Sequence, residues 1–327
     1  MRRREVITLL GGAAAAWPLA GRAQQAAVPV IGFLGPGTLE PAAHLLAVFR
    51  RALAEAGYVE GQNVTIEYRF AENRSDRLPQ LAADLVRQQV AVIVCGATDV
   101  TALVAKAATT SIPILFGVVE DPVERGLVTS LARPGGNATG VHYFLAQLGV
   151  KTLGLLHELV PVAARIGLLA NPNNLTYERV MKDVTAAGLA VGVQVDIVQA
   201  SNDREIEAAF VMLARNKVDA LLVAPDTLFF NRRLLIVLLA TRNGLPAIYT
   251  LREYAAAGGL MSYGTSLTEV YRQYGVYAGR ILKGAKPADL PVVQSTRFEL
   301  VINLPATRAI GLQIPDKLLA LADEVIE

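Results

Sequence analysis

Polar side chains that could recognise a small charged molecule recur just after short apolar segments of this 327-residue chain. Thr38 and Thr98 offer hydroxyl groups, Asn171 offers an amide, and Asp121 and Asp226 offer carboxylates. Such groups can donate hydrogen bonds to a ligand carboxylate or accept them from a ligand amino group. Each residue type is also a favoured helix N-cap, so capping alone would explain any single one. The recurrence of the pattern indicates a binding site, provided that the fold brings these side chains together.

Two further candidates lie in or directly after the apolar segment PAIYTL (246–251). Tyr249 could supply an aromatic wall, although a tyrosine in an apolar run is as often part of the core. The guanidinium of Arg252 could bind a ligand carboxylate through two parallel hydrogen bonds. The carboxylates of Asp121 and Asp226 would instead suit a ligand amino group.

The stretch RPGGNATGV (133–141) contains three glycines and raises the question of a phosphate-binding loop. A dinucleotide-binding turn needs the spacing G-x-G-x-x-G after a strand and before a helix, and a P-loop needs G-K-S/T. Neither pattern is present in the stretch. We interpret it as a hinge between two lobes, with an ordinary structural turn as the alternative, and expect no nucleotide or other cofactor.

Residue patterns for catalysis or metal binding are equally sparse. The three histidines, His44, His142 and His157, show no metal-ligand spacing, and there is no G-x-S-x-G nucleophile motif. Cys95 is the single cysteine and lies in the apolar run VAVIVCG, which indicates a buried side chain. We therefore expect no metal site and no enzymatic activity.

Composition limits the class of partner. Apolar residues make up 53% of the chain and charged residues 18%, enough for a large core in two lobes. Residues 24–327 carry 27 basic against 28 acidic residues, a net charge of −1. A chain so close to neutral lacks the basic surface that nucleic-acid binding requires.

Short apolar strands alternate with amphipathic helices from residue 28 onward, and the alternation restarts after the glycine stretch. This pattern predicts parallel sheets with helices on both faces. We expect two doubly wound Rossmann-like α/β lobes, with a last helix over 315–326. Polar residues at the carboxyl ends of parallel strands would then face a shared cleft, where open α/β sheets bind ligands.

The first 23 residues are typical of an export signal. A basic start precedes an apolar stretch from Val6 to Ala20, and Gly21 and Ala23 suit cleavage after Ala23. Arg3 and Arg4 resemble a twin-arginine signal, with an ordinary secretory signal as the alternative. We expect a periplasmic protein, soluble after cleavage at the end of segment 1–23, that loses Trp17.

Four longer stretches together resemble the extracytoplasmic solute-binding proteins of ABC transporters, in the group with tryptophan- and tyrosine-binding members. The stretches are residues 107–141, 159–174, 245–267 and 271–304. The resemblance implies a type I periplasmic-binding fold, with one lobe over 28–142 plus 265–286 and the other over 143–264 plus 290–327. It also implies hinge crossings close to Gly140, Val141, Tyr263 and Gly264.

By the same resemblance, the chain would close two lobes around a small polar or amino-acid-like ligand and deliver it to an ABC permease. Thr98 and Asp121 would contact the ligand from one lobe, and Asn171 and Asp226 from the other. We expect a monomer with no nucleic-acid partner. Two alternatives stay open: a ligand-sensing module that acts on a receptor or kinase, and an enzyme on the same scaffold.

Overall fold

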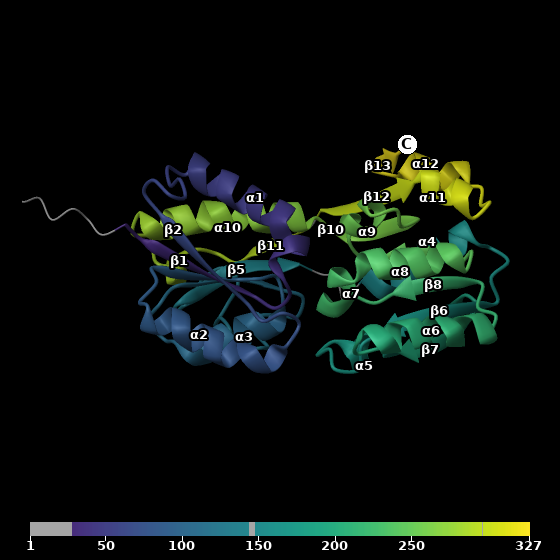
Figure 1. Cartoon of the computed structure of the whole chain (residues 1–327), viewed down its shortest axis with the longest axis horizontal. Coiled ribbons are helices and arrows are strands. Elements are labelled where there is room, and N and C mark those ends of the chain that lie inside the picture. The colour runs from purple at the N-terminus through teal and green to yellow at the C-terminus, as the bar shows by residue number, and fades with distance from the viewer. Residues whose placement is uncertain (1–27, 144–147, 296) are drawn as a thin grey trace, which may run out of the picture.

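The computed structural model describes residues 28–143, 148–295 and 297–327. The predicted export signal over 1–23, with Trp17, lies outside the described residues. Figure 1 shows two lobes lying end to end, each a sheet with helices packed against it. The predicted class, two doubly wound α/β lobes, is confirmed by two separate sheets whose strand orders require crossover connections.

The first lobe contains a parallel sheet of order β11-β5-β4-β3-β1-β2 in the described residues. The central strands of this sheet are buried on both faces, which is why they read as mostly apolar runs in the sequence, whereas the two edge strands are only partly buried. The strands are β1 (Val30–Gly35), β2 (Thr65–Phe70), β3 (Val92–Cys95), β4 (Ile114–Val118), β5 (Ala138–Tyr143) and β11 (Val293–Ser295).

Helices cover both faces of this sheet because side chains alternate along each strand. In β3, Val92 and Val94 pack with the core under α1 and α10, whereas Ile93 and Cys95 pack with the core under α2 and α3. The helices are α1 (Leu39–Glu55), α2 (Leu78–Arg87), α3 (Asp99–Ala108) and α10 (Leu267–Leu282).

Helix α10 packs closely against α1, although more than 200 residues separate their starts. A Cβ atom at Gly275 would lie 2.6 Å from the Cβ of Ala52, and one at Gly279 would lie 2.3 Å from the Cβ of Ala56. Small residues four apart on both helices therefore permit this backbone approach. This contact attaches the C-terminal part of the chain to the first lobe.

The second lobe contains a sheet of order β13-β12-β10-β9-β8-β6-β7. Its described pairs are parallel except β10 with β12, which is antiparallel. The strands are β6 (Arg165–Ala170), β7 (Gln194–Gln199), β8 (Ala220–Val223), β9 (Ala247–Tyr249), β10 (Met261–Thr265), β12 (Phe298–Asn303) and β13 (Glu324–Ile326).

The helices of the second lobe divide between the two faces of its sheet. One core lies under α6 to α9 and the other under α4, α5 and α12. These helices are α4 (Gly149–Leu159), α5 (Tyr177–Ala190), α6 (Asp203–Arg215), α7 (Thr227–Asn231), α8 (Arg233–Arg242), α9 (Arg252–Ala256), α11 (Leu304–Ala309) and α12 (Asp316–Leu321).

The C-terminal region differs from the expectation in two ways. Strand β11 pairs with β5, so residues 293–295 lie in the first lobe and not in the second, and the last crossing falls between β11 and β12. The expected helix over 315–326 is a short helix, α12, followed by β13, because β12 offers a free edge on which residues 324–326 pair.

The four predicted hinge residues lie inside paired strands, close to two of the crossings between lobes. Gly140 and Val141 lie in β5, and Tyr263 and Gly264 lie in β10. A Cβ at Gly140 would lie 1.9 Å from the carbonyl oxygen of Phe116, so this glycine permits close strand pairing. The chain crosses after Tyr143 and again at Ser266. The stretch 133–141 is therefore a turn followed by the start of β5, and the crossing between the lobes lies further along the chain.

Candidate functional site

A cavity of about 300 Å³ lies between the two lobes, a size in the usual range of small-molecule sites. It is formed by the segments that follow the strands of both sheets, as expected for open α/β sheets. Four predicted site residues line it: Thr38, Thr98, Asn171 and Asp226.

Asp226 is the most extensively bonded polar group in this lining. Its Oδ1 accepts hydrogen bonds from the backbone N–H of Leu228 (2.8 Å) and Phe229 (3.3 Å), which caps α7. Its Oδ2 accepts from Nδ2 of Asn171 (3.1 Å) and Nδ2 of Asn174 (2.8 Å). Removal from water raises the pKa of the Asp226 carboxyl, although these four donors act in the opposite direction. The network fixes the carboxylate at the cavity wall.

The amides that hold Asp226 are themselves fixed by the segment after β6. Oδ1 of Asn171 accepts from the N–H of Asn173 at 3.0 Å. Oδ1 of Asn174 accepts from the N–H of Thr176 at 2.9 Å and from its hydroxyl at 2.8 Å. Because each amide oxygen is engaged locally, each NH₂ group is directed toward Asp226. The run NPNN (171–174) in the sequence was the available sign of this network.

The first lobe contributes two helix N-termini to the cavity. Thr98 precedes α3 and its Oγ1 accepts from the N–H of Thr101 at 3.3 Å. Thr38 precedes α1, and its side chain makes no capping hydrogen bond. Asp99 is buried and accepts from the N–H groups of Val119 (3.2 Å) and Glu120 (3.1 Å), which joins the ends of β3 and β4.

The apolar part of the lining contains aromatic rings beside aliphatic side chains, and these rings were not foreseen from the sequence. The ring centroid of Phe33 lies 5.8 Å from that of Phe70 and 6.2 Å from that of Tyr271. Phe230 lies in the lining contributed by the second lobe, with the guanidinium of Arg233 4.8 Å from its ring centroid. Burial raises the pKa of Tyr271, which keeps its phenol neutral. The cavity thus combines aromatic rings with a few fixed polar groups.

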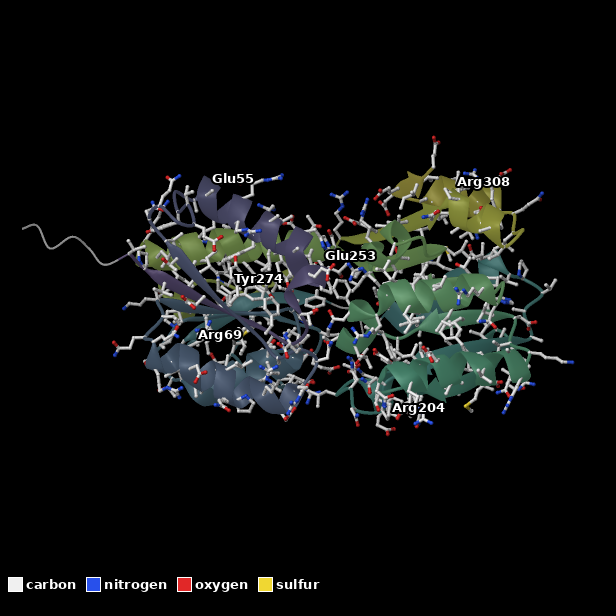
Figure 2. The ribbon with its side chains drawn as sticks, in the orientation of Figure 1. Glu55, Arg69, Arg204, Glu253, Tyr274 and Arg308 are labelled. Carbon is white, nitrogen blue, oxygen red and sulfur yellow. The ribbon has the colours of Figure 1, made fainter. Side chains whose placement is uncertain are left out.

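Three polar contacts join the lobes around the cavity. Nδ2 of Asn231 donates to Oδ1 of Asn73 at 2.6 Å, and Arg179 forms an ion pair with Glu120. Nε2 of His44 lies 3.5 Å from Oε1 of Glu253. Figure 2 shows Glu253 at the junction of the lobes. Each of these contacts joins residues of different lobes and so helps to hold the two lobes together around the cavity.

Three predicted ligand contacts do not line the cavity. Oδ1 of Asp121 accepts from the N–H of Val123 at 2.7 Å and so caps a surface turn. Tyr249 is 1% exposed and stacks on Tyr254, with ring centroids 4.6 Å apart. Arg252 pairs with Glu324 of β13, Nε to Oε2 at 2.7 Å. Local sequence gave no sign of the partner of Arg252, because Glu324 lies 72 residues away.

The acidic and basic side chains in the described lining are Asp99 and Asp226, and both are carboxylates. A bound carboxylate would therefore meet helix N-termini and hydroxyl groups, not a cationic side chain. No group of three His, Cys, Asp or Glu residues in the described ranges could hold a metal ion. None of the helices within those ranges has the length and apolar character needed to cross a membrane.

Residues 42–326 match the protein family described as ABC transporter substrate binding protein. The chain is 29% identical over 265 residues to the tyrosine-binding protein of Clostridioides difficile, covering 81% of this chain and 76% of that protein. Two solved structures are similar over 91% of this chain and 99% of their own. One, a conserved domain protein from Vibrio cholerae, has a TM-score of 0.82 and 24% identity.

The other solved structure is an ABC domain from Streptococcus pneumoniae in complex with L-Trp, with a TM-score of 0.79 and 25% identity. Periplasmic binding proteins share the same two-lobed fold at lower similarity, which confirms the expected type I architecture.

Proposed function

The chain belongs to the ABC transporter substrate-binding protein family, and from this premise we propose that it binds an amino acid with an aromatic side chain. The observation that carries the proposal is the make-up of the cavity between the lobes. An aromatic wall around Phe33 and the fixed carboxylate of Asp226 occupy one enclosed space. A ligand with a ring and an amino group would use both.

The amino group of the ligand is assigned to Asp226. A charge-assisted hydrogen bond to a carboxylate is among the stronger polar contacts in proteins. Asp226 already accepts four hydrogen bonds, which is about as many as a carboxylate has lone-pair sites, so a ligand ammonium would share one of these sites. The negative charge of Asp226 is not neutralised by any cation in the described lining. A ligand ammonium would supply the missing positive charge.

The carboxylate of the ligand is assigned to the first lobe. Helices α1 and α3 begin at the cavity, after Thr38 and Thr98, and helix N-termini favour negative charge. The free hydroxyl of Thr38 adds a donor. The two charged ends of a zwitterion would then lie on different lobes, so that the ligand itself would favour closure.

The ring of the ligand is assigned to the rings of Phe33, Phe70 and Tyr271. Two relatives support an aromatic ligand, because one is called a tyrosine-binding protein and another was solved with L-Trp. Offset or tilted ring contacts would add to the free energy gained by burying the apolar surface of the ligand.

Transport is the proposed role of this binding. Residues 1–23 would export the chain, and the closed form would dock on a membrane permease and release its ligand by opening at the crossings near Gly140, Val141, Tyr263 and Gly264. Among the described residues of the lining there is no pair of a histidine or lysine base with a nucleophile, and we propose that the chain does not catalyse a reaction.

A thermal-shift panel on residues 24–327 tests the proposal. L-tyrosine, L-tryptophan and L-phenylalanine should raise the melting temperature by several degrees, since a ligand at about 100 times its Kd stabilises by roughly 2.7 kcal/mol. Tyramine, which lacks the carboxylate, and 4-hydroxyphenylpropionate, which lacks the amino group, should give much smaller shifts. Shifts with branched-chain amino acids or sugars and none with aromatic amino acids would contradict the proposal.

A further inference from the structure

Helices α6 and α8 of the second lobe expose an unusual amount of apolar surface. The two helices cover the same face of the second sheet and contact each other (Figure 1). Their exposed fractions are 52% for Val211, 50% for Met212, 69% for Leu234 and 45% for Leu238. Exposed apolar side chains on two neighbouring helices are a candidate interaction site.

A groove between the two helices accompanies this surface. It encloses about 450 Å³ and is lined by side chains from both helices. Phe210, Val211 and Leu239 form its apolar part, and Glu207 and Arg215 stand on its rim. The groove and the exposed side chains together form what we call the α6–α8 face.

The charges on this face have a regular arrangement. Glu207 lies four residues before Val211 and Arg215 lies four residues after it, so the three form one stripe along α6. Neither Glu207 nor Arg215 has an ion-pair or hydrogen-bond partner within the described ranges. By contrast, Arg232 pairs with Asp203 at 2.7 Å at the nearby start of α6. The stripe is therefore an unmatched pair of opposite charges around an apolar centre.

We propose that the α6–α8 face is a two-fold interface between two copies of this chain. If α6 packs antiparallel against α6 of a second copy, with the axis at Val211, then Glu207 lies opposite the partner's Arg215. Glu207 and Arg215 are eight residues apart, which is about 12 Å along a helix. Because this spacing is the same in both copies, both ion pairs can form at once. A two-fold interface requires such self-complementarity, and a parallel arrangement would place like charges opposite each other.

The position of the face allows the proposed binding function to continue in the dimer. The groove is lined from the second half of α6 and the end of α8, where the chain leads back to the starts of β8 and β9. The cavity lies at the opposite ends of these strands. Association would thus leave the cavity and the cross-lobe contacts uncovered. This differs from the monomer that the sequence led us to expect.

Sedimentation velocity on residues 24–327 over a wide concentration range tests the interface. The wild type should show a monomer–dimer equilibrium. Glu207→Arg and Arg215→Glu should each weaken dimerisation by roughly 100-fold, because each places two pairs of like charges across the axis. The double variant E207R/R215E should restore it, because the complementarity is then exchanged. Arg51→Glu changes the charge of the exposed face of α1 equally and should have no effect.

Each outcome decides the proposal. A wild type that sediments as a monomer at all concentrations would overturn it. Single variants that dimerise like the wild type would place the interface elsewhere, and a double variant as weak as the single ones would refute the antiparallel pairing. Melting temperatures of all variants, measured alongside, separate loss of dimer from loss of folding, and restoration in the double variant cannot come from unfolding.

Discussion

Substitution of Asp226 by asparagine is the most informative single change, because it keeps the size of the side chain and removes its charge. The remaining oxygen can still accept the N–H groups of Leu228 and Phe229 and so cap α7. The new NH₂ group would face Nδ2 of Asn171 and Nδ2 of Asn174, which are donors too. Two hydrogen bonds are therefore lost, both on the side of the carboxylate that faces the second-lobe amides.

The cost to folding follows from these partners. A buried donor left without an acceptor costs about 1–3 kcal/mol. Asn174 keeps a second acceptor, the carbonyl oxygen of Pro225 at 3.2 Å, so the full penalty applies to Asn171 alone. We expect the free energy of unfolding without ligand to fall by about 1–3 kcal/mol, and the chain to remain folded.

The loss of ligand affinity in Asp226→Asn is a separate effect from the loss of folding stability. A hydrogen bond to a charged group contributes about 1.5–3 kcal/mol, which corresponds to roughly 10- to 100-fold in affinity. Isothermal titration calorimetry of Asp226→Asn with L-tyrosine should show this loss. Asp121→Asn is the matched control, since Asp121 caps a turn outside the cavity, and its affinity should equal that of the wild type.

Two results would refute this reasoning. Unchanged affinity in Asp226→Asn, with a lowered melting temperature, would make Asp226 a structural residue only. A loss of affinity in Asp121→Asn as large as in Asp226→Asn would mean that the ligand binds at the end of β4 and not where the cavity places it.

Three further predictions concern pH, strand pairing and closure. Burial raises the pKa of Asp226 above its ordinary value of 3.8, so the folded chain holds this proton more tightly than the unfolded chain. The contribution of Asp226 to the free energy of unfolding should therefore decrease as pH rises above 3.8. The melting temperature of the wild type, relative to that of Asp226→Asn, should fall over the same pH range. Amino-acid affinity should instead rise as the carboxylate ionises. Gly140→Ala places a Cβ 1.9 Å from a carbonyl oxygen of β4 and should lower the free energy of unfolding by about 1–3 kcal/mol in denaturant titrations. Gly154→Ala is the control, because a Cβ there has nothing within 4 Å, and it should stabilise α4 or leave it unchanged. Arg179→Gln removes the cross-lobe ion pair with Glu120. We expect ligand binding to weaken several-fold, little change in the melting temperature without ligand, and a more open ligand-free chain. Small-angle scattering that shows the ligand-free variant no more open than the wild type would contradict this.

The sequence predicted the lobes because local physics decides them. Strands buried on both faces read as apolar runs, and the segments that follow them must lie at one edge of the sheet. For this reason Thr38, Thr98, Asn171 and Asp226 could be placed at the cavity from residue type and position alone.

The remaining parts depend on contacts between distant segments. Tyr249 could face the cleft or the core, and stacking on Tyr254 decides for the core. Arg252 could reach a ligand only if β13 did not supply Glu324. Phe33 and Phe70 read as ordinary core residues, and only the packing of β1, β2 and α10 shows that their rings form a cavity wall.

We expect the two lobes to enclose one zwitterionic aromatic amino acid. Calorimetric titration of residues 24–327, freed of co-purified ligand by unfolding and refolding, with L-tyrosine and L-tryptophan tests it most directly. We expect saturable binding of one ligand per chain, and much weaker binding of analogues that lack either charged group. Folded protein that takes up neither amino acid, or that binds 4-hydroxyphenylpropionate as tightly as L-tyrosine, would contradict it.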